Sequence, residues 1–123
     1  MTHKLLLVDD SGLARRRMRA ILEPAGFHIV EAEDGMTAIE RYYLEKPDLV
    51  ILDLVMKGMY GLDVLTKLRE LDPSVRVIVV SADVQQSSQD LVEAAGAAGF
   101  LTKPVDRDNV LTLVRGVLAR TAS

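Results

Sequence analysis

Polar side chains suited to phosphoryl chemistry stand at the ends of short apolar runs in this sequence. Carboxylates that lie close together repel one another unless a cation lies among them. Mg2+ prefers oxygen ligands and keeps positions for water and phosphate oxygens. A carboxylate beside Mg2+ can attack phosphorus to form an acyl phosphate, whose added charge a lysine and a hydroxyl would neutralise. The residues that suggest this chemistry are Asp9, Asp10, Asp53, Ser81 and Lys103.

The position of each residue in its run suggests a role. Asp53 follows the run that we expect to be central in a sheet, so it is the candidate nucleophile. Asp9 and Asp10 would flank it on one side, and Ser81 and Lys103 on the other. An Asp-Asp pair can also simply cap the next helix, and taken alone it would do so about half the time. If all these residues had only structural roles, however, four separate run ends would each have supplied a residue of the required chemistry by chance.

Short apolar runs alternate with longer segments of helical period along the whole chain. Four runs are almost continuously apolar, as expected of strands covered on both faces, while the run 27–32 alternates and indicates an edge strand. Five strand-helix units imply a parallel sheet with right-handed crossovers, because five units cannot close a barrel. The predicted strands are 4–10, 27–32, 48–53, 75–81 and 99–103, and the predicted helices are 12–23, 35–45, 62–71, 86–95 and 106–119.

The fold class that suits this alternation is α/β, a flavodoxin-like doubly wound sheet. It has five parallel strands in the order 2-1-3-4-5 and five helices. In such a sheet, ligands bind outside the carboxyl ends of the strands, near the point where the strand order reverses. The five polar residues would therefore meet on one rim. Ser11, just after the acid pair, is the predicted N-cap of the first helix.

Length and composition predict a single globular domain. The chain has 123 residues, of which 49% are hydrophobic and 27% charged, and its apolar runs are too short to cross a membrane. A net charge of −3 argues against a direct nucleic-acid surface on the whole domain. Without cysteine or a secretion signal, we expect a cytoplasmic protein. A solvated helix face, with docking of a partner as the alternative, is expected for Arg15, Arg16, Arg17 and Arg19.

Four segments of the sequence resemble the receiver domains of two-component response regulators, the CheY-like family. They are "LLLVDDS", "DLVILDLVMKGMYGLDVL", "VIVVSAD" and "AAGAAGFLTKPV", and the resemblance extends over almost the whole chain, from the first segment to the last. The resemblance implies that Asp9, Asp10 and Asp53 bind Mg2+, with the backbone carbonyl of Val55 as a further ligand. It also implies that Asp53 accepts a phosphoryl group from a histidine kinase or a histidine phosphotransfer protein.

The same resemblance implies a switch that reads the phosphoryl group. Ser81 matches the switch hydroxyl of the family and Lys103 its lysine, with a cis peptide bond expected before Pro104. Phe100 matches the switch aromatic; it can also be an ordinary core ring, and the two roles are compatible. The face formed by the fourth helix, fifth strand and fifth helix would then contact a downstream protein target, through a shift in a pre-existing equilibrium.

Several positions depart from the usual pattern of the family. Lys57 replaces a common proline, and Tyr60 stands where an acidic or amide residue is frequent. Val55 cannot orient a water by hydrogen bonding whereas Asp83 can, so these two positions give no single expectation for the lifetime of the phosphorylated state. The segment before Phe100 lacks the aspartates that pair across the dimers of many receivers, so we expect a monomer.

The leading functional prediction is a single receiver domain spanning residues 1–123. It would be a phosphoacceptor rather than an enzyme, with only self-phosphorylation and self-dephosphorylation chemistry. One alternative is a receiver cut from a longer regulator or hybrid kinase. Another is a Mg2+-dependent aspartyl phosphatase of the haloacid dehalogenase type, but Val55 occupies the place of its second aspartate. A degenerate receiver is a third alternative, against which the intact set of five polar residues argues.

Overall fold

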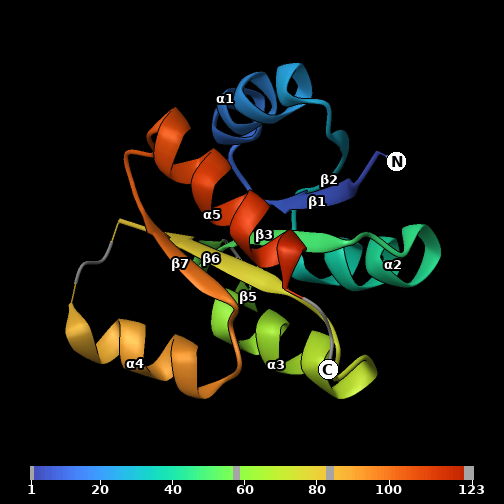
Figure 1. Ribbon diagram of the computed structural model, residues 1–123. Coiled ribbons are helices and arrows are strands. Elements are labelled where there is room, and N and C mark those ends of the chain that lie inside the picture. Colours follow the sequence, from blue (N-terminus) through green and yellow to red (C-terminus); the bar gives the residue numbers. More distant parts are fainter. Residues whose placement is uncertain (1, 57–58, 83–84, 121–123) are drawn as a thin grey trace.

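The computed structural model describes residues 2–56, 59–82 and 85–120. Its main feature is a sheet of five parallel strands in the order β2-β1-β3-β6-β7 (Figure 1). Counted along the chain, this is the predicted order 2-1-3-4-5, so the flavodoxin-like fold is confirmed. The strands are β1 (Lys4–Val8), β2 (His28–Ala32), β3 (Leu49–Asp53), β6 (Val77–Ser81) and β7 (Gly99–Thr102).

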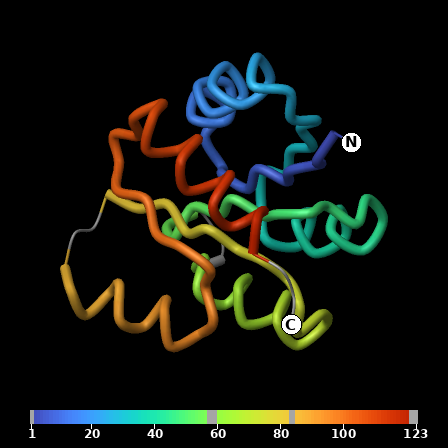
Figure 2. The backbone as a smooth tube through the Cα atoms, viewed as in Figure 1, coloured from blue at the N-terminus to red at the C-terminus, as the bar shows by residue number. Residues whose placement is uncertain are grey.

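Helices cover both faces of the sheet. The first and last helices lie together on one face, and the other three cover the opposite face (Figures 1 and 2). This arrangement follows from right-handed crossovers that wind in opposite directions from the central strands. The five helices are α1 (Gly12–Leu22), α2 (Gly35–Glu45), α3 (Gly61–Leu71), α4 (Gln86–Ala94) and α5 (Arg107–Ala119).

The apolar runs of the sequence form two cores, one on each face of the sheet. In β1, for example, Leu5 and Leu7 pack against α1 and α5, whereas Leu6 and Val8 pack on the side of α2 and α3. All four side chains are buried. Because successive side chains of a strand point to opposite faces, a strand covered on both faces must be apolar throughout. This explains why the central runs do not alternate.

Side-chain caps set the start of three helices and so the positions of the loops. Ser11 caps α1, as predicted, by accepting a hydrogen bond from the N–H of Ala14 at 3.2 Å. Asp34 and Asp106 cap α2 and α5 in the same way. A cap accepts one of the N–H groups that the first helical turn leaves without a partner. The acid pair is therefore followed at once by a fixed helix start.

Two short elements were not predicted. A 3-10 turn, η1 (Glu23–Ala25), ends the first helical segment at Pro24, and Gly26 follows with a φ of 98°. Two antiparallel strands of two residues each, β4 (Val55–Met56) and β5 (Met59–Tyr60), form a small hairpin between β3 and α3. Within the described residues, no helix combines the length and the apolar character needed to cross a lipid bilayer.

A half-buried phenol joins α2 to the end of α3. Tyr42 is half-buried, and its hydroxyl donates a hydrogen bond to Oδ2 of Asp72 at 2.7 Å. Burial, and then the carboxylate of Asp72, raise the pKa of Tyr42. Hydrogen bonds from Ser74 and then from Tyr42 lower the pKa of Asp72. The adjacent Tyr43 is exposed, as expected when two neighbouring tyrosines lie on one helix.

We expect Tyr42→Phe to lower the free energy of unfolding by about 1 kcal/mol near neutral pH, because Oδ2 of Asp72 loses the hydrogen bond from Tyr42. Because the pKa of Tyr42 is raised in the folded protein, its contribution to the free energy of unfolding is complete below about pH 10, the pKa of a free phenol. The contribution is lost as the pH rises above that value. The wild type should therefore lose stability more steeply than Tyr42→Phe as the pH rises above that value. Urea denaturation measures both effects. Tyr43→Phe is the matched control, and an equal loss in that variant would contradict the prediction.

Candidate functional site

The three predicted acidic residues meet at the carboxyl end of the sheet. Strands β1 and β3 are neighbours, with Val8 paired to Leu52, so the residues that follow these two strands lie side by side. One carboxylate oxygen from each of Asp9, Asp10 and Asp53 lies within 4.8 Å of the other two. Asp53 is buried, Asp9 half-buried and Asp10 exposed. The site is therefore deepest at Asp53 and open at Asp10.

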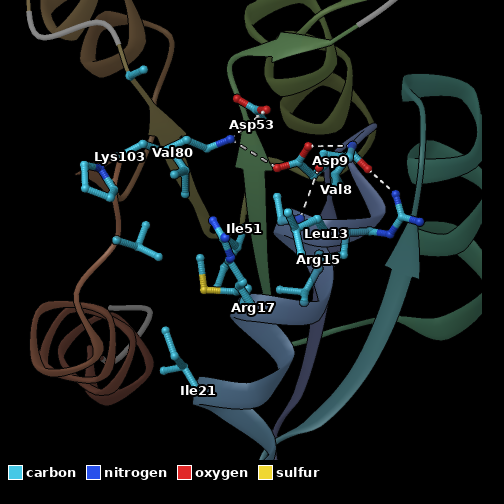
Figure 3. A pocket seen from close by; sticks show the side chains of 17 residues that line it. Val8, Asp9, Leu13, Arg15, Arg17, Ile21, Ile51, Asp53, Val80 and Lys103 are labelled. Atoms are coloured by element: carbon cyan, nitrogen blue, oxygen red, sulfur yellow. Dashed lines mark hydrogen bonds and ion pairs between the residues drawn. The ribbon is translucent and has the colours of Figure 1, made fainter.

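Lys103 follows β7 and approaches Asp53 from the side opposite to Asp9 (Figure 3). Its Nζ lies 3.2 Å from Oδ2 of Asp53 and 3.4 Å from Oδ2 of Asp9. The main chain holds the lysine in place, because its N–H donates to the carbonyl of Ser81 at 2.8 Å. The peptide bond between Lys103 and Pro104 is cis, as expected. One ammonium thus lies between carboxylates from two strands.

The electrostatics of the site come from burial and from like charge. Burial, and then the negative charge of Asp9, raise the pKa of Asp53, although the Val55 N–H and the Lys103 ammonium oppose this. Burial disfavours the charged form of Lys103, but the carboxylates of Asp53 and Asp9 outweigh it and raise the pKa of the lysine. One lysine cannot balance three carboxylates. The site therefore favours a further positive charge.

The donor set suits Mg2+. It offers only oxygen atoms, which this hard cation prefers. Opposite ligands of an octahedral Mg2+ lie about 4.2 Å apart, twice the usual metal-oxygen distance, and the three carboxylates span at most 4.8 Å. A small adjustment or an intervening water would bring all three to one ion. The residues present therefore fit the predicted cofactor, and exposed Asp10 leaves room for water ligands.

The other predicted site residues lie on the strands and loop around Asp53. Ser81 is buried at the end of β6, the strand next to β3. The N–H of Val55 donates to Oδ1 of Asp53 at 3.2 Å, while its side chain is 64% exposed. Phe100 is half-buried in β7 and packs against the core on the side of α2, α3 and α4. Tyr60 is exposed opposite Val55 in the hairpin. The predicted effects of Lys57 and Asp83 concern residues outside those described.

The expectation of a solvated arginine face is wrong for two of the four arginines. Arg15 and Arg19 are half-buried and both pair with Glu31 of β2, whereas Arg16 and Arg17 are exposed as expected. Arg15 also donates a hydrogen bond from Nη1 to the main-chain carbonyl of Asp9. The i, i+4 spacing of Arg15 and Arg19 was a signal that both could contact one acceptor.

A groove leads away from the acidic cluster, between α1 and the connection from β7 to α5. Its volume is about 460 Å³. Leu13, Met18 and Ile21 of α1 line the groove, as do Pro104 and Val105 of the connection. Leu13 and Ile21 are labelled in Figure 3. Leu13 is half exposed at this groove. The carboxylates are thus accessible from a surface that is largely apolar.

Comparisons with known proteins identify the family of this chain. The family model described as the response regulator receiver domain matches residues 5–115. Chemotaxis protein CheY of Bacillus subtilis is 39% identical over 119 residues, which are 96% of this chain and 99% of that protein. Sporulation initiation phosphotransferase F of the same organism is 32% identical over 122 residues, which are 96% and 95% of the two chains.

Solved structures of similar fold include the CheX-CheY-BeF3-Mg2+ complex from Borrelia burgdorferi. The match has a TM-score of 0.92 and 33% identity, and it covers 96% of this chain and 90% of the other. The strand order, the acidic cluster at the carboxyl end of the sheet and the matches over nearly the full length of these relatives lead to one assignment. The chain belongs to the family of CheY-like response regulator receiver domains.

Proposed function

We propose that this protein is a receiver that accepts a phosphoryl group on Asp53 from a histidine kinase or a histidine phosphotransfer protein. In the transfer, a carboxylate oxygen of Asp53 bonds to phosphorus while the bond between phosphorus and the donor's imidazole nitrogen breaks. The nitrogen keeps the electron pair. The observation that carries the proposal is the meeting of Asp53, the acid pair and Lys103 at one point.

Each residue of the site has a part in this reaction. Asp9, Asp10, Asp53 and the main-chain carbonyl of Val55 would hold Mg2+, which would supply positive charge for the phosphoryl oxygens. The Lys103 ammonium, 3.2 Å from Asp53, is placed to pair with the charge that the phosphoryl group adds. Ser81 would donate its hydroxyl to a phosphoryl oxygen. Held beside Mg2+, the Asp53 carboxylate would be charged and ready to attack phosphorus.

The output would be a change in what a partner protein can bind. A phosphoryl group on Asp53 attracts Ser81, and Phe100 on the neighbouring strand would turn inward as Ser81 moves. The contacts exist only in the active arrangement, so they shift an existing equilibrium rather than create a new state. The face formed by α4, β7 and α5 would carry the signal to a downstream protein target.

The wider setting of the protein follows from the same reading. We place it in the cytoplasm, where histidine kinases present their phosphoryl groups, as a monomer that acts through protein contacts and binds neither nucleic acid nor membrane. It is a phosphoacceptor and not a turnover enzyme. A phosphatase of the haloacid dehalogenase type needs a second aspartate two residues after the nucleophile, and valine occupies that position, Val55, in this chain. The same domain would serve this role alone or within a longer regulator.

Incubation with Mg2+ and acetyl phosphate tests the proposal. We expect intact-protein mass spectrometry to find one phosphoryl group that hydroxylamine removes, as it does from acyl phosphates. EDTA should prevent the labelling. Failure to label, or a label that hydroxylamine leaves in place, would overturn the proposal. Continued hydrolysis of many phosphate esters would favour the phosphatase.

Beryllium fluoride, a phosphoryl mimic, separates a working receiver from a degenerate one. A working receiver should bind it in the presence of Mg2+, and amide resonances on α4, β7 and α5 should shift in a two-dimensional NMR spectrum. The shifts should extend beyond the residues around Asp53, because the switch connects the site to that face. Unchanged spectra would identify a receiver that does not respond to phosphorylation.

A further inference from the structure

One arginine connects the acid pair to the edge strand of the sheet. Arg15 donates from Nη1 to the main-chain carbonyl of Asp9 and from Nε to Oε1 of Glu31 at 2.7 Å (Figure 3 shows Arg15 beside Asp9). The side chain of Arg15 is only 17% exposed. It therefore uses two edges of its planar guanidinium for two acceptors on different elements, which a lysine cannot do.

Glu31 is itself held in place from both sides. It lies on the face of β2 that α1 covers and pairs in register with Leu7 of β1. Arg19, one turn after Arg15, binds its second carboxylate oxygen. Burial opposes ionisation, but hydrogen bonds from the two arginines outweigh it and lower the pKa of Glu31. The acceptor for Arg15 is thus a fixed, charged group rather than a mobile surface side chain.

The carbonyl that Arg15 contacts controls the direction of the acid pair. The carbonyl of Asp9 lies in the same rigid peptide plane as the N–H of Asp10, so anchoring it fixes the plane from which Asp10 departs. The N–H of Asp9 is already bonded to Ala32 of β2 at 3.2 Å, and Oδ1 of Asp9 accepts from the N–H of Ser11 at 2.9 Å. The hydrogen bond from Arg15 fixes the other end of this residue, the carbonyl that leads into the peptide bond with Asp10.

We propose that Arg15 is a positioning residue for the Mg2+ site, acting with Glu31 to hold the Asp9–Asp10 turn so that both carboxylates face Asp53. This inference rests on the proposed function, because it concerns the metal that phosphorylation would need. Mg2+ demands near-ideal octahedral geometry, so a small misplacement of a ligand weakens binding. Groups that orient metal ligands typically change the affinity about 10- to 100-fold when they are removed.

Charge alone predicts the opposite result. Arg15 is a cation bonded to the main chain of Asp9, and removing a cation from beside an anionic site should strengthen the attraction of that site for Mg2+. A positioning role predicts weaker binding. The direction of the change in Mg2+ affinity therefore separates the two effects without any assumption about their size.

Titration of the protein with Mg2+, followed by NMR amide shifts or calorimetry, measures this affinity directly. We expect Arg15→Ala to raise the dissociation constant about 10-fold. Arg16→Ala makes the same charge change at an exposed site of the same helix and is the control. It should stay within about two-fold of the wild type, the size of a surface charge effect. Unchanged or tighter binding by Arg15→Ala, or an equal loss in Arg16→Ala, would overturn the proposal.

A second variant keeps the test valid if Arg15→Ala unfolds, which urea denaturation in EDTA would reveal. Glu31→Gln retains an acceptor but loses the charge that holds Arg15, so it should weaken Mg2+ binding in the same direction. The double variant should be no weaker than Arg15→Ala, because Glu31 acts through Arg15. Additive losses, or wild-type affinity in Glu31→Gln, would contradict this. A wild-type protein that bound no Mg2+ would overturn the proposed function, and this inference with it.

Discussion

Asp53→Asn is expected to abolish phosphoryl incorporation from acetyl phosphate and Mg2+. The amide has nearly the same shape as the carboxylate but lacks the charged oxygen that attacks phosphorus. We expect no label on the neighbouring Asp9 or Asp10. Intact-protein mass spectrometry measures the loss, and Asp63→Asn, an exposed residue of α3, is the control that should label normally.

The stability of Asp53→Asn shows whether lost labelling reflects lost chemistry. The substitution removes one of three crowded carboxylates, and burial and Asp9 raise the pKa of Asp53, so its charge is unfavourable in the folded protein. We expect the free energy of unfolding in metal-free buffer at pH 7 to be no lower than that of the wild type. A residual label on Asp53→Asn would show that another residue is the acceptor. A marked loss of stability would contradict the stated electrostatics.

Gly61→Ala is expected to lower the free energy of unfolding by about 2 to 3 kcal/mol, the upper range for overpacked sites. A Cβ at this position would lie 2.4 Å from the carbonyl oxygen of Asp53 and 2.7 Å from Cα of Leu54. Both atoms are backbone, so they cannot move aside as a side chain would. The N–H of Gly61 also donates to the carbonyl of Leu54 at 2.7 Å, which holds the two segments together.

Gly116→Ala is the matched control for this substitution. Gly116 lies inside α5, is exposed, and an added Cβ would meet nothing within 4 Å. Alanine should therefore stabilise that helix by about 0.5 to 1 kcal/mol. Urea denaturation of the two variants gives opposite signs if close packing against Asp53 is the cause. Gly61→Ala should also label more slowly, because the displaced backbone carries the acceptor; wild-type stability would refute the close approach.

The fold could be predicted because its main signals are local. Continuous apolar runs require strands covered on both faces, and the alternating run from Phe27 to Ala32 marked an edge. Ser11 and Pro24 marked the limits of the first helical segment. The hairpin of β4 and β5 could not be predicted, because two-residue strands carry no periodicity and depend on the packing of Gly61 against the preceding strand end.

The residues of the site could be predicted, but not the contacts that orient them. Their positions follow from the rule that parallel strands bring their carboxyl ends to one edge. The role of Arg15 was missed because a helix that is charged on its outer face does not reveal which charge meets a strand edge. Glu31 seemed an ordinary polar residue of an alternating strand. The N–H of Val55 was missed as a donor to Asp53. Every residue except proline has a main-chain N–H, and only the conformation of the turn after β3 directs this one toward Asp53.

The ion pairs of Lys103 join Asp9 and Asp53 to a residue 94 and 50 positions further along the chain. During synthesis, β1 and β3 leave the ribosome well before β7, so the aspartates emerge without the cation that later balances them. A nascent or truncated chain that stops before Gly99 holds mutually repelling carboxylates and no ammonium among them. Under the proposed function, acceptance of a phosphoryl group would therefore depend on the segment that follows the last strand, and cleavage before Lys103 would abolish it while leaving Asp53 intact.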